Sequence, residues 1–307
     1  MIAVFDIGGT AIKYGVVSLN GEIYRHDSFP TDVRLGGEAL IDRVIGRVKE
    51  LQTEWEISGI SISTAGQIDS VNGVVFHATD NIPGYTGLNI SSKVHEATGL
   101  KVSVENDVNC TALGEHWMGV ARGAADFLCV TIGTGIGGAL FLREGLYAGP
   151  AFAAGEIGHI NLYPGGRVCT CGNEGCYEQY ASSKALEMLV QEKFDSIMDL
   201  RDFFEQLRNG QEEMLEVFHQ WVDDLTNGLR SVVHMINPEL IIIGGGISEQ
   251  GDFLLDAIKT SLYKKIMPNH ASKLQVKMAE YGNKANLLGA VKHYRNQYLR
   301  EEKGVER

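Results

Sequence analysis

Basic residues, proline, cysteine and long apolar runs are all scarce in this chain of 307 residues. Its 27 Lys and Arg are outnumbered by 39 Asp and Glu, and the net charge of −12 argues against binding to nucleic acid or to an anionic membrane. No apolar run approaches the roughly 18 residues that would cross a bilayer. Residues 1–6 resemble a strand rather than a leader peptide, so we expect a cytoplasmic protein.

Cysteine is limited to five residues, an odd number that fits poorly with a secreted disulfide framework. Cys110 and Cys129 are expected to be ordinary buried residues. The other three follow the sequence Gly155-Glu156-Ile157-Gly158-His159. Three thiols and an imidazole make a complete tetrahedral zinc set with no open position for water. We therefore predict a structural zinc ion bound by four side chains: His159, Cys169, Cys171 and Cys176.

Proline is rare, with six residues, whereas glycine is frequent, with 37. This balance suggests tight turns and close approach of the backbone to ligands. Three glycine-rich turns follow predicted strands, namely Asp6-Ile7-Gly8-Gly9-Thr10 with Lys13 nearby, Gly133-Thr134-Gly135-Ile136-Gly137-Gly138, and Gly244-Gly245-Gly246. Their amides and hydroxyls could bind the phosphates of a nucleotide. The Walker pattern is missing, and the second turn continues into a strand rather than a helix, which disfavours a dinucleotide dehydrogenase.

The spacing of apolar residues predicts a meander of strands followed by alternating helices and strands, twice along the chain. The predicted strands are 2–6, 12–18, 22–26, 57–63, 101–105, 127–131, 139–142, 240–243 and 274–279. The predicted helices are 38–55, 88–98, 107–117, 214–236, 253–263 and 285–299. Asp107 is in a position to cap the third of these helices, which follows strand 101–105 and runs through Trp117.

A strand, a glycine turn, a second strand and an X-Gly turn occur twice at nearly one offset. Gly8 and Gly133 are separated by 125 positions (133 − 8), and Gly21 and Gly145 by 124 (145 − 21). We interpret this as two copies of one supersecondary unit, each beginning a domain. Chance similarity of two glycine-rich hairpins is the alternative.

Five stretches carry a resemblance to a known family: Asp6 to Lys13, the strand end Glu105-Asn106-Asp107, Thr131 to Gly138, Gly155 to His159, and the CxCGxxGCxE loop from Cys169 to Glu178. Together they resemble the ROK family of repressors, open reading frames and kinases, over residues 2 to about 289. The resemblance implies an α/β fold with two actin-like (ribonuclease H-like) domains and a ligand cleft between them. The expected domains are 1–118, completed by helix 285–299, and 119–284, which carries the zinc loop.

The resemblance also implies roles for single residues. Asp107 corresponds to the catalytic general base, with a plain helix cap as the alternative, and Lys13 to a phosphate ligand, with a solvated strand lysine as the alternative. The implied sugar-binding residues are Gly66, Asn81, Asn106, Asp107, Glu156, His159 and Glu178. The implied residues around ATP and Mg²⁺ are Asp6, Gly8, Gly9, Thr10, Lys13, Gly133, Thr134, Gly135, Gly137, Gly138, Gly244, Gly245 and Gly246.

These roles imply ATP-dependent phosphorylation of the 6-hydroxyl of a hexose or N-acetylhexosamine, by a homodimer. Ser63-Thr64-Ala65-Gly66 stands where many glucokinases of the family have Ala-Pro-Gly, and this version looks more like N-acetylmannosamine kinases. Glucose, fructose and β-glucosides stay open as substrates. A sugar-responsive repressor is less expected, because the first phosphate turn begins at Asp6 with no DNA-binding segment ahead of it. A catalytically inactive sugar-binding protein is disfavoured by the intact Asn106-Asp107 pair.

Overall fold

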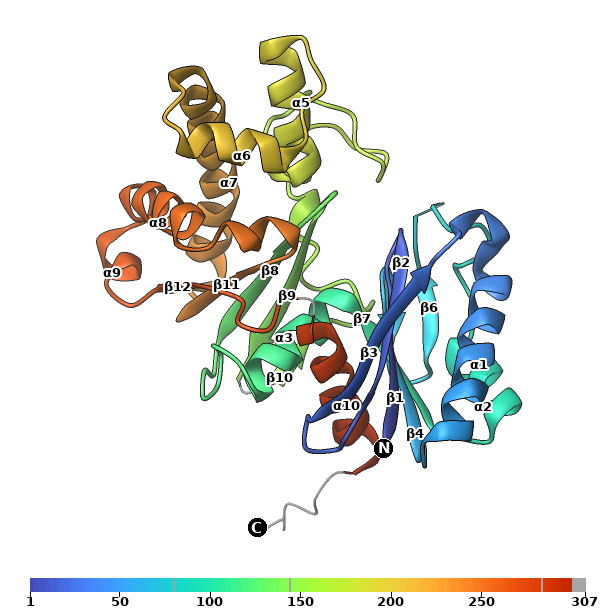
Figure 1. The fold of residues 1–307 in the computed structure, drawn as a ribbon. Coiled ribbons are helices and arrows are strands. Elements are labelled where there is room, and N and C mark those ends of the chain that lie inside the picture. Colours follow the sequence, from blue (N-terminus) through green and yellow to red (C-terminus); the bar gives the residue numbers. More distant parts are fainter. Residues whose placement is uncertain (80, 144, 283, 300–307) are drawn as a thin grey trace, which may run out of the picture. The chain divides into compact units, whose positions relative to one another are not determined.

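The computed structural model describes residues 1–79, 81–143, 145–282 and 284–299, which form two compact units (Figure 1). The first unit comprises Met1–Gly123, Leu146–Ala154 and Asn283–Arg307. The second comprises Ala124–Gly145 and Gly155–Gly282. The short segment Leu146–Ala154 therefore groups with the first unit, although its first two residues belong to β10 (Gly145–Tyr147), a strand of the second unit's sheet.

The first unit is built on a five-stranded sheet with the order β3-β2-β1-β4-β7. β1 pairs antiparallel with β2 and parallel with β4, and β4 pairs parallel with β7. Every residue of β1 and β4 is buried, as expected for strands covered on both faces. A separate small hairpin is formed by β5 and β6. The strands are β1 Ile2–Ile7, β2 Ala11–Val17, β3 Ile23–Pro30, β4 Gly59–Thr64, β5 Gln67–Asp69, β6 Val74–His77 and β7 Val102–Asn106.

Helices cover both faces of this sheet (Figure 1). On one face lie α1 (Gly36–Glu54), preceded by a 3-10 turn at Val33–Leu35, and α2 (Ile90–Thr98), whose apolar residues share a core with Phe5 and Ile62. On the other face lie α3 (Asp107–Trp117) and α10 (Lys284–Tyr298). The C-terminal helix thus completes the unit that the N-terminal strand begins.

The backbones of α3 and α10 approach unusually closely, at two glycines. A Cβ atom on Gly289 would lie 1.6 Å from the carbonyl oxygen of Cys110, and one on Gly114 would lie 2.2 Å from that of Ala285. Real Cβ atoms essentially never make such contacts, so only glycine permits this crossing. The distance between the two helices is therefore set by these residues.

We expect Gly289→Ala to lower the free energy of unfolding by about 3 kcal/mol, because the added methyl group forces the helices apart. Gly46→Ala is the matched control, since Gly46 lies on the exposed side of α1 and a Cβ there would meet nothing within 4 Å. The control should be neutral or raise stability by about 0.5–1 kcal/mol. Urea unfolding followed by circular dichroism measures both, and equal midpoints for Gly289→Ala and the wild type would contradict the interpretation.

The second unit is built on a five-stranded sheet with the order β10-β9-β8-β11-β12. β8 pairs antiparallel with β9 and parallel with β11, which pairs parallel with β12. The order and directions repeat those of the first sheet, so the duplicated meander predicted from the glycine turns is present in both units. The strands are β8 Phe127–Ile132, β9 Ile136–Leu142, β10 Gly145–Tyr147, β11 Leu240–Gly244 and β12 Gln275–Met278.

The helical part of the second unit is organised around α7 (Glu212–Ile236), which ends at Asn237 in the left-handed conformation, just before Pro238. Trp221 of this helix is fully buried, and its indole nitrogen donates to the carbonyl oxygen of Ser182. The other helices are α4 Glu178–Ala181, α5 Ser183–Phe194, α6 Leu200–Arg208, α8 Asp252–Lys265 and α9 Pro268–Ala271, with 3-10 turns at Ile157–His159 and Gly246–Gln250.

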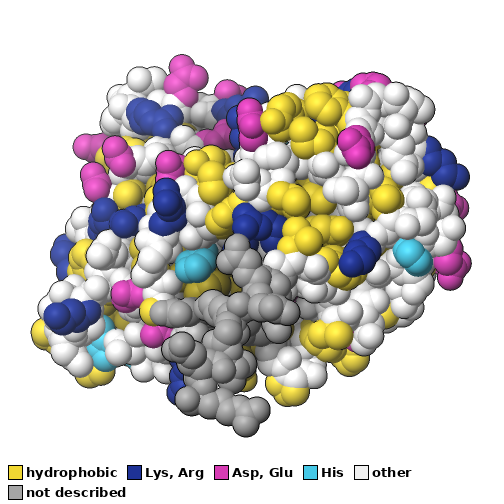
Figure 2. Space-filling model, turned by 90° about the horizontal axis from the view of Figure 1, so that it is seen from below, with side chains coloured by type: hydrophobic (Ala, Val, Ile, Leu, Met, Phe, Trp, Pro, Cys, Tyr) yellow, Lys and Arg dark blue, Asp and Glu magenta, His cyan; other side chains and the backbone are white. Residues whose placement is uncertain are grey.

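Charged side chains of both signs are interspersed with apolar ones on the face shown in Figure 2. Among the described helices, none combines the length and apolar character needed to span a bilayer.

Candidate active site

The junction between β7 and α3 holds the predicted general base. Asn106, rather than Asp107, is the N-cap of α3: its side-chain oxygen accepts hydrogen bonds from the amides of Val108 (2.8 Å) and Asn109 (3.0 Å). The expectation that Asp107 caps the helix is therefore wrong. A capping oxygen must come from the residue just outside the helix, and Asp107 is already the first helical residue. The alternative role of Asp107, that of a plain helix cap, is therefore filled by Asn106.

Asn106 donates hydrogen bonds to two neighbours, Gly66 and Glu105. Its amide nitrogen Nδ2 donates to the carbonyl oxygen of Gly66 (2.9 Å), and its backbone amide donates to Oε1 of Glu105 (2.8 Å). Glu105 is buried, accepts a second bond from Asn109 Nδ2 (3.0 Å), and lies 3.8 Å from Nδ1 of His293 in α10. Burial lowers the pKa of His293, although the Glu105 charge opposes this. The buried carboxylate of Glu105 thus holds the turn before Asp107 in place.

Asp107 itself is half-buried at the start of α3, and its Oδ1 accepts a hydrogen bond from the Val108 amide (3.0 Å). The N-terminus of a helix favours a negatively charged side chain. The geometry therefore presents a carboxylate at the start of a helix, where a negative charge is favoured, and a general base for a hydroxyl proton requires such a group.

The first glycine turn joins β1 to β2 in the same unit. Asp6 is 5% exposed, and its carboxylate lies 3.8 Å from Nζ of Lys13. Burial raises the pKa of Asp6, while Lys13 and hydrogen bonds from Asn286 and Ser63 act to lower it. The amide of Gly8 donates to the carbonyl oxygen of Ala11 (3.2 Å). Lys13 is therefore an ion-pair partner of Asp6, so it is not a purely solvated lysine.

The three glycine turns contain glycines of two kinds. At Gly8, Gly138 and Gly245 an added Cβ would lie 3.1 Å or less from a backbone atom, so packing alone explains glycine there. At Gly9, Gly133 and Gly246 a Cβ would meet nothing within 4 Å, and none of the three has a positive φ. One glycine in each turn is thus unexplained by the fold, as expected if a ligand approaches the backbone closely.

The remaining members of the predicted nucleotide set lie on these turns. Thr10 and Thr134 are exposed, whereas Gly135 and Gly137 are partly buried within the second turn. Gly244, the last residue of β11, is buried against Ala279 and Thr131. Of the three glycines in this turn, Gly244 is therefore shielded from solvent, and Gly245 and Gly246 are exposed.

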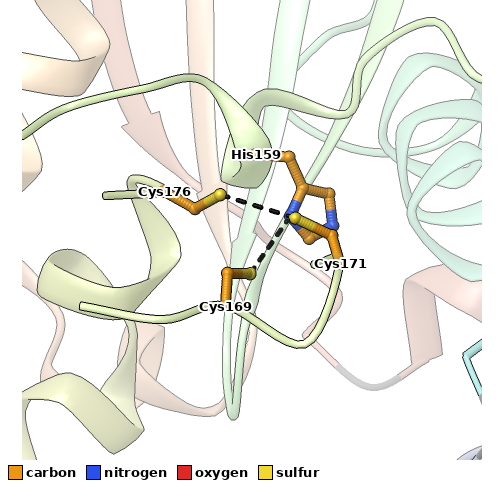
Figure 3. A group of neighbouring side chains, drawn as sticks. All are labelled: His159, Cys169, Cys171 and Cys176. Atoms are coloured by element: carbon orange, nitrogen blue, oxygen red, sulfur yellow. Dashed lines mark hydrogen bonds between the residues drawn. The ribbon is translucent and has the colours of Figure 1, made fainter. Parts of the chain in front are cut away.

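The predicted zinc ligands come together in the second unit (Figure 3). The ligand atoms of His159, Cys169, Cys171 and Cys176 all lie within 4.8 Å of one another. Sγ of Cys171 is 3.6 Å from Sγ of Cys176, and Sγ of Cys169 is 3.6 Å from Nδ1 of His159. Tetrahedral zinc with bonds of about 2.0–2.3 Å separates its ligand atoms by roughly 3.5–3.8 Å. The four side chains therefore fit a structural zinc site.

The pKa values of the cluster thiols are shifted in different directions. Burial alone would raise the pKa of Cys171, but hydrogen bonds from the Asn173 backbone and the neighbouring thiols lower it to about 7. Burial and the two neighbouring thiols raise the pKa of Cys176 to about 12. Because burial and the neighbouring thiols disfavour the thiolate form of Cys176, a cation would be needed to stabilise three thiolates at once.

Two carboxylates flank His159. Oε2 of Glu156 lies 4.0 Å from its Nε2, and Oε1 of Glu178 lies 3.9 Å from its Nδ1. Glu178 also accepts bonds from Sγ of Cys169 (3.3 Å) and from the amide of Ile136 (3.4 Å). Glu178 thereby links the cysteine loop to the second glycine turn. Nδ1 is the ring nitrogen that faces the thiols, which leaves Nε2 on the side of Glu156.

The spacing Gly155-x-x-Gly158 has a structural reason. A Cβ on Gly155 would lie 2.4 Å from the carbonyl oxygen of Gly138, and one on Gly158 would lie 2.2 Å from that of Ile136. The two glycines allow this segment to pack directly on β9. Packing therefore fixes the backbone on which Glu156 and His159 are carried.

Two predicted sugar-binding residues lie in loops of the first unit. Asn81 is exposed and precedes Ile82, and Gly66 adopts a φ of 107° just after β4. Several residues around Asp6 and Asp107 were not identified from the sequence, because their partners are distant along the chain. They are Thr111, Asn286 and His293.

The chain is similar in sequence and in fold to known sugar kinases. The chain is 32% identical to a glucokinase of Thermotoga maritima, over 93% of this chain and 94% of the relative. It is similar to the solved structure of a ROK family glucokinase from Streptomyces griseus in complex with glucose and AMPPNP, with a TM-score of 0.84, 30% identity, and coverage of 94% and 97% of the two chains. The Listeria monocytogenes protein Lmo2764, a candidate N-acetylmannosamine kinase, gives a TM-score of 0.85, 28% identity, and coverage of 96% and 99%. A family model matches residues 2–296, and the chain belongs to the ROK family.

Proposed function

We propose that this protein is an ATP-dependent sugar kinase that transfers the γ-phosphoryl group of ATP to the 6-hydroxyl of a hexose or an N-acetylhexosamine. The observation that carries the proposal is the Asn106-Asp107 junction. Asn106 is the N-cap of α3 and fixes the turn, and Asp107 is the half-buried first residue of the helix. Membership of the ROK family supports the same activity.

In the proposed reaction Asp107 accepts the proton of the sugar hydroxyl as its oxygen attacks the γ-phosphorus. The bond between that phosphorus and the β–γ bridging oxygen breaks, and ADP leaves with the electron pair. The start of α3 keeps the carboxylate in place without a rearrangement during the reaction. Positioning and charge stabilisation supply most of the rate in phosphoryl transfer, so a rigid base is the expected design.

The phosphates are proposed to bind at the open glycines Gly9, Gly133 and Gly246, where the absence of a Cβ leaves room for a ligand to approach the backbone. When bound, Mg²⁺ neutralises charge on the transferred phosphoryl group. Asp6 would hold it, because carboxylate oxygens are ligands that Mg²⁺ prefers.

The residues proposed to bind the sugar hydroxyls include Asn106, Asp107, Glu156, His159 and Glu178. A zinc ion on His159, Cys169, Cys171 and Cys176 would be structural, since all four positions are filled by protein. Its proposed task is to fix the loop that carries Glu178 and the imidazole of His159. A homodimer is likewise proposed, and sedimentation analysis would check it.

We propose N-acetylmannosamine as the substrate, with glucose as the alternative. The loop Ser63-Thr64-Ala65-Gly66 is tied to Tyr85 through a hydrogen bond of 2.6 Å between the Thr64 and Tyr85 hydroxyls. Thr64 is completely buried, so its hydroxyl stabilises the loop through this bond, whereas Ala65 is exposed. The absence of proline here changes the loop shape near the sugar, which is the feature that suggests room for an acetamido group. Glucose stays a candidate because of the Thermotoga maritima glucokinase.

A coupled assay with ATP and a panel of N-acetylmannosamine, glucose, fructose and cellobiose tests both parts. We expect the largest kcat/KM for N-acetylmannosamine. A preference for glucose would replace the proposed substrate and leave the kinase activity standing. The absence of phosphorylation of any of these sugars would contradict the kinase proposal itself.

A further inference from the structure

The side chain of Asn286, in the first turn of α10, contacts the carboxylate of Asp6 and, through the hydroxyl of Thr111, the backbone of Asp107. It belongs to the last helix of the chain, whereas its partners belong to β1 and α3. The close crossing at Gly114 and Gly289 brings the start of α10 to this place. Asn286 is half-buried, and both ends of its amide have partners.

On one side, Nδ2 of Asn286 donates to Oδ1 of Asp6 at 3.1 Å. The same carboxylate oxygen accepts a bond from Ser63 Oγ (3.2 Å), and Lys13 Nζ lies 3.8 Å from the other oxygen. A carboxylate that is 5% exposed needs such donors, because leaving it unpaired away from water is costly. Asn286 is therefore one of three groups that orient Asp6 and act to lower its pKa, against the larger effect of burial, which raises it.

On the other side, Oδ1 of Asn286 accepts a hydrogen bond from the hydroxyl of Thr111. That hydroxyl also lies 3.0 Å from the carbonyl oxygen of Asp107, one helical turn earlier in α3. The amide is oriented by this chemistry: only its nitrogen can donate to a carboxylate, and only its oxygen can accept from a hydroxyl. The resulting chain runs from Asp6 through Asn286 and Thr111 to the backbone of Asp107.

We propose that Asn286 is a positioning residue of the kinase site, which couples the orientation of Asp6 to the first turn of α3 and so to Asp107. The proposal rests on the proposed kinase function. It assigns to a residue of the C-terminal helix a role that neither the glycine turns nor the Asn106-Asp107 pair supplies. A residue that only fills space would need the volume of Asn286 but not its donor.

Asn286→Ala and Asn286→Asp separate these roles, with Asn296→Ala on the exposed side of the same helix as the matched control. We expect Asn286→Ala to lower kcat about 10- to 100-fold with the KM for sugar within about 3-fold, since small displacements of a base have effects of this size. Asn286→Asp keeps the shape but places an oxygen against Asp6, so it should be at least as impaired. Asn296→Ala should match the wild type.

Thr111→Val tests the second half of the chain. If the coupling runs through both residues, the double variant Asn286→Ala/Thr111→Val should lose no more kcat than about the worse single variant, because the two act as one unit. Fully multiplicative losses would overturn the coupling. Wild-type turnover in Asn286→Asp would overturn it too, since the donor would then be unnecessary.

A readout without turnover keeps this inference separate from the kinase proposal. Amide hydrogen exchange of peptides that cover residues 105–111 should be faster in Asn286→Ala than in Asn296→Ala, at temperatures where both remain folded. Unchanged exchange would overturn the inference even if kcat fell. An inactive wild type would instead contradict the kinase proposal, while the exchange result would still decide whether Asn286 supports the turn.

Discussion

Asp107→Asn is expected to retain sugar binding and to lower kcat by about 10³-fold, within the range of 10²–10⁴ that a general base contributes. Asparagine keeps the size of the side chain, and its oxygen can still accept the bond that Asp107 accepts from the Val108 amide (3.0 Å). Asn106 remains the cap of α3, so the fold should be unaffected. What is lost is the ability to take up the hydroxyl proton.

The measurement combines coupled-assay kinetics with sugar binding by calorimetry. Asp42→Asn is the matched control, because Asp42 is an exposed carboxylate on α1 that forms an ion pair with Lys93 at 2.9 Å. It should keep the wild-type kcat. Turnover of Asp107→Asn within a few-fold of the wild type would exclude Asp107 as the base. A parallel loss of sugar affinity and kcat would instead indicate a binding residue.

Local pattern was sufficient for most of the secondary structure. The apolar periodicity of residues 38–55 and 214–236 predicts helices that the structure places at Gly36–Glu54 and Glu212–Ile236. The continuous run Leu240–Ile243 predicts a strand buried in a parallel sheet, and β11 is paired parallel on both sides. Such elements are predictable because the side chains that face the core recur at the period of the element itself.

The zinc cluster was predictable for a related reason: three of its four ligands lie within eight residues, and the fourth lies ten residues before the first of them. The contacts of α10 could not be predicted from the sequence. Asn286 and Asp6 are 280 positions apart, and His293 is 188 positions from Glu105 (293 − 105). Nothing in the local sequence of a helix indicates which distant carboxylate it will meet, because that depends on how the sheet and the last helix close.

The glycines of the predicted site are a second case in which the sequence alone does not indicate the role of a residue. The sequence identifies three glycine-rich turns but does not distinguish glycines needed for packing from glycines open to a ligand. Gly245 combines a φ of 85° with a Cβ position 2.3 Å from the carbonyl oxygen of Ile132, whereas Gly246 beside it has open space. The distinction lies in backbone conformation and in contacts with other segments, so it required the structure.

Cys171→Ser is expected to lose the zinc ion and to raise the KM for sugar about 100-fold. Cys171 is the exposed member of the cluster, so the substitution should cost little in core packing. Three remaining ligands hold zinc weakly, and the loop then loses the link that fixes it. Inductively coupled plasma mass spectrometry should find one zinc per wild-type chain and none per Cys171→Ser chain.

Cys129→Ala is the matched control, because Cys129 is a buried cysteine of β8 outside the cluster. It removes a thiol and should keep the metal and the sugar affinity. A strong chelator added to the wild type should reproduce the effect of Cys171→Ser. Wild-type sugar affinity in the metal-free variant would contradict the proposed role of the loop.

The two substrates should respond differently to loss of the metal. His159 would be freed from the cluster, and its position relative to Glu156 and Glu178 would no longer be set. Glu178, however, keeps its bond from the Ile136 amide and so remains attached to the second glycine turn. We therefore expect the KM for ATP to change by no more than about 3-fold while that for sugar rises. Equal increases in both would place the effect of the metal on the whole second unit rather than on its sugar-facing loop.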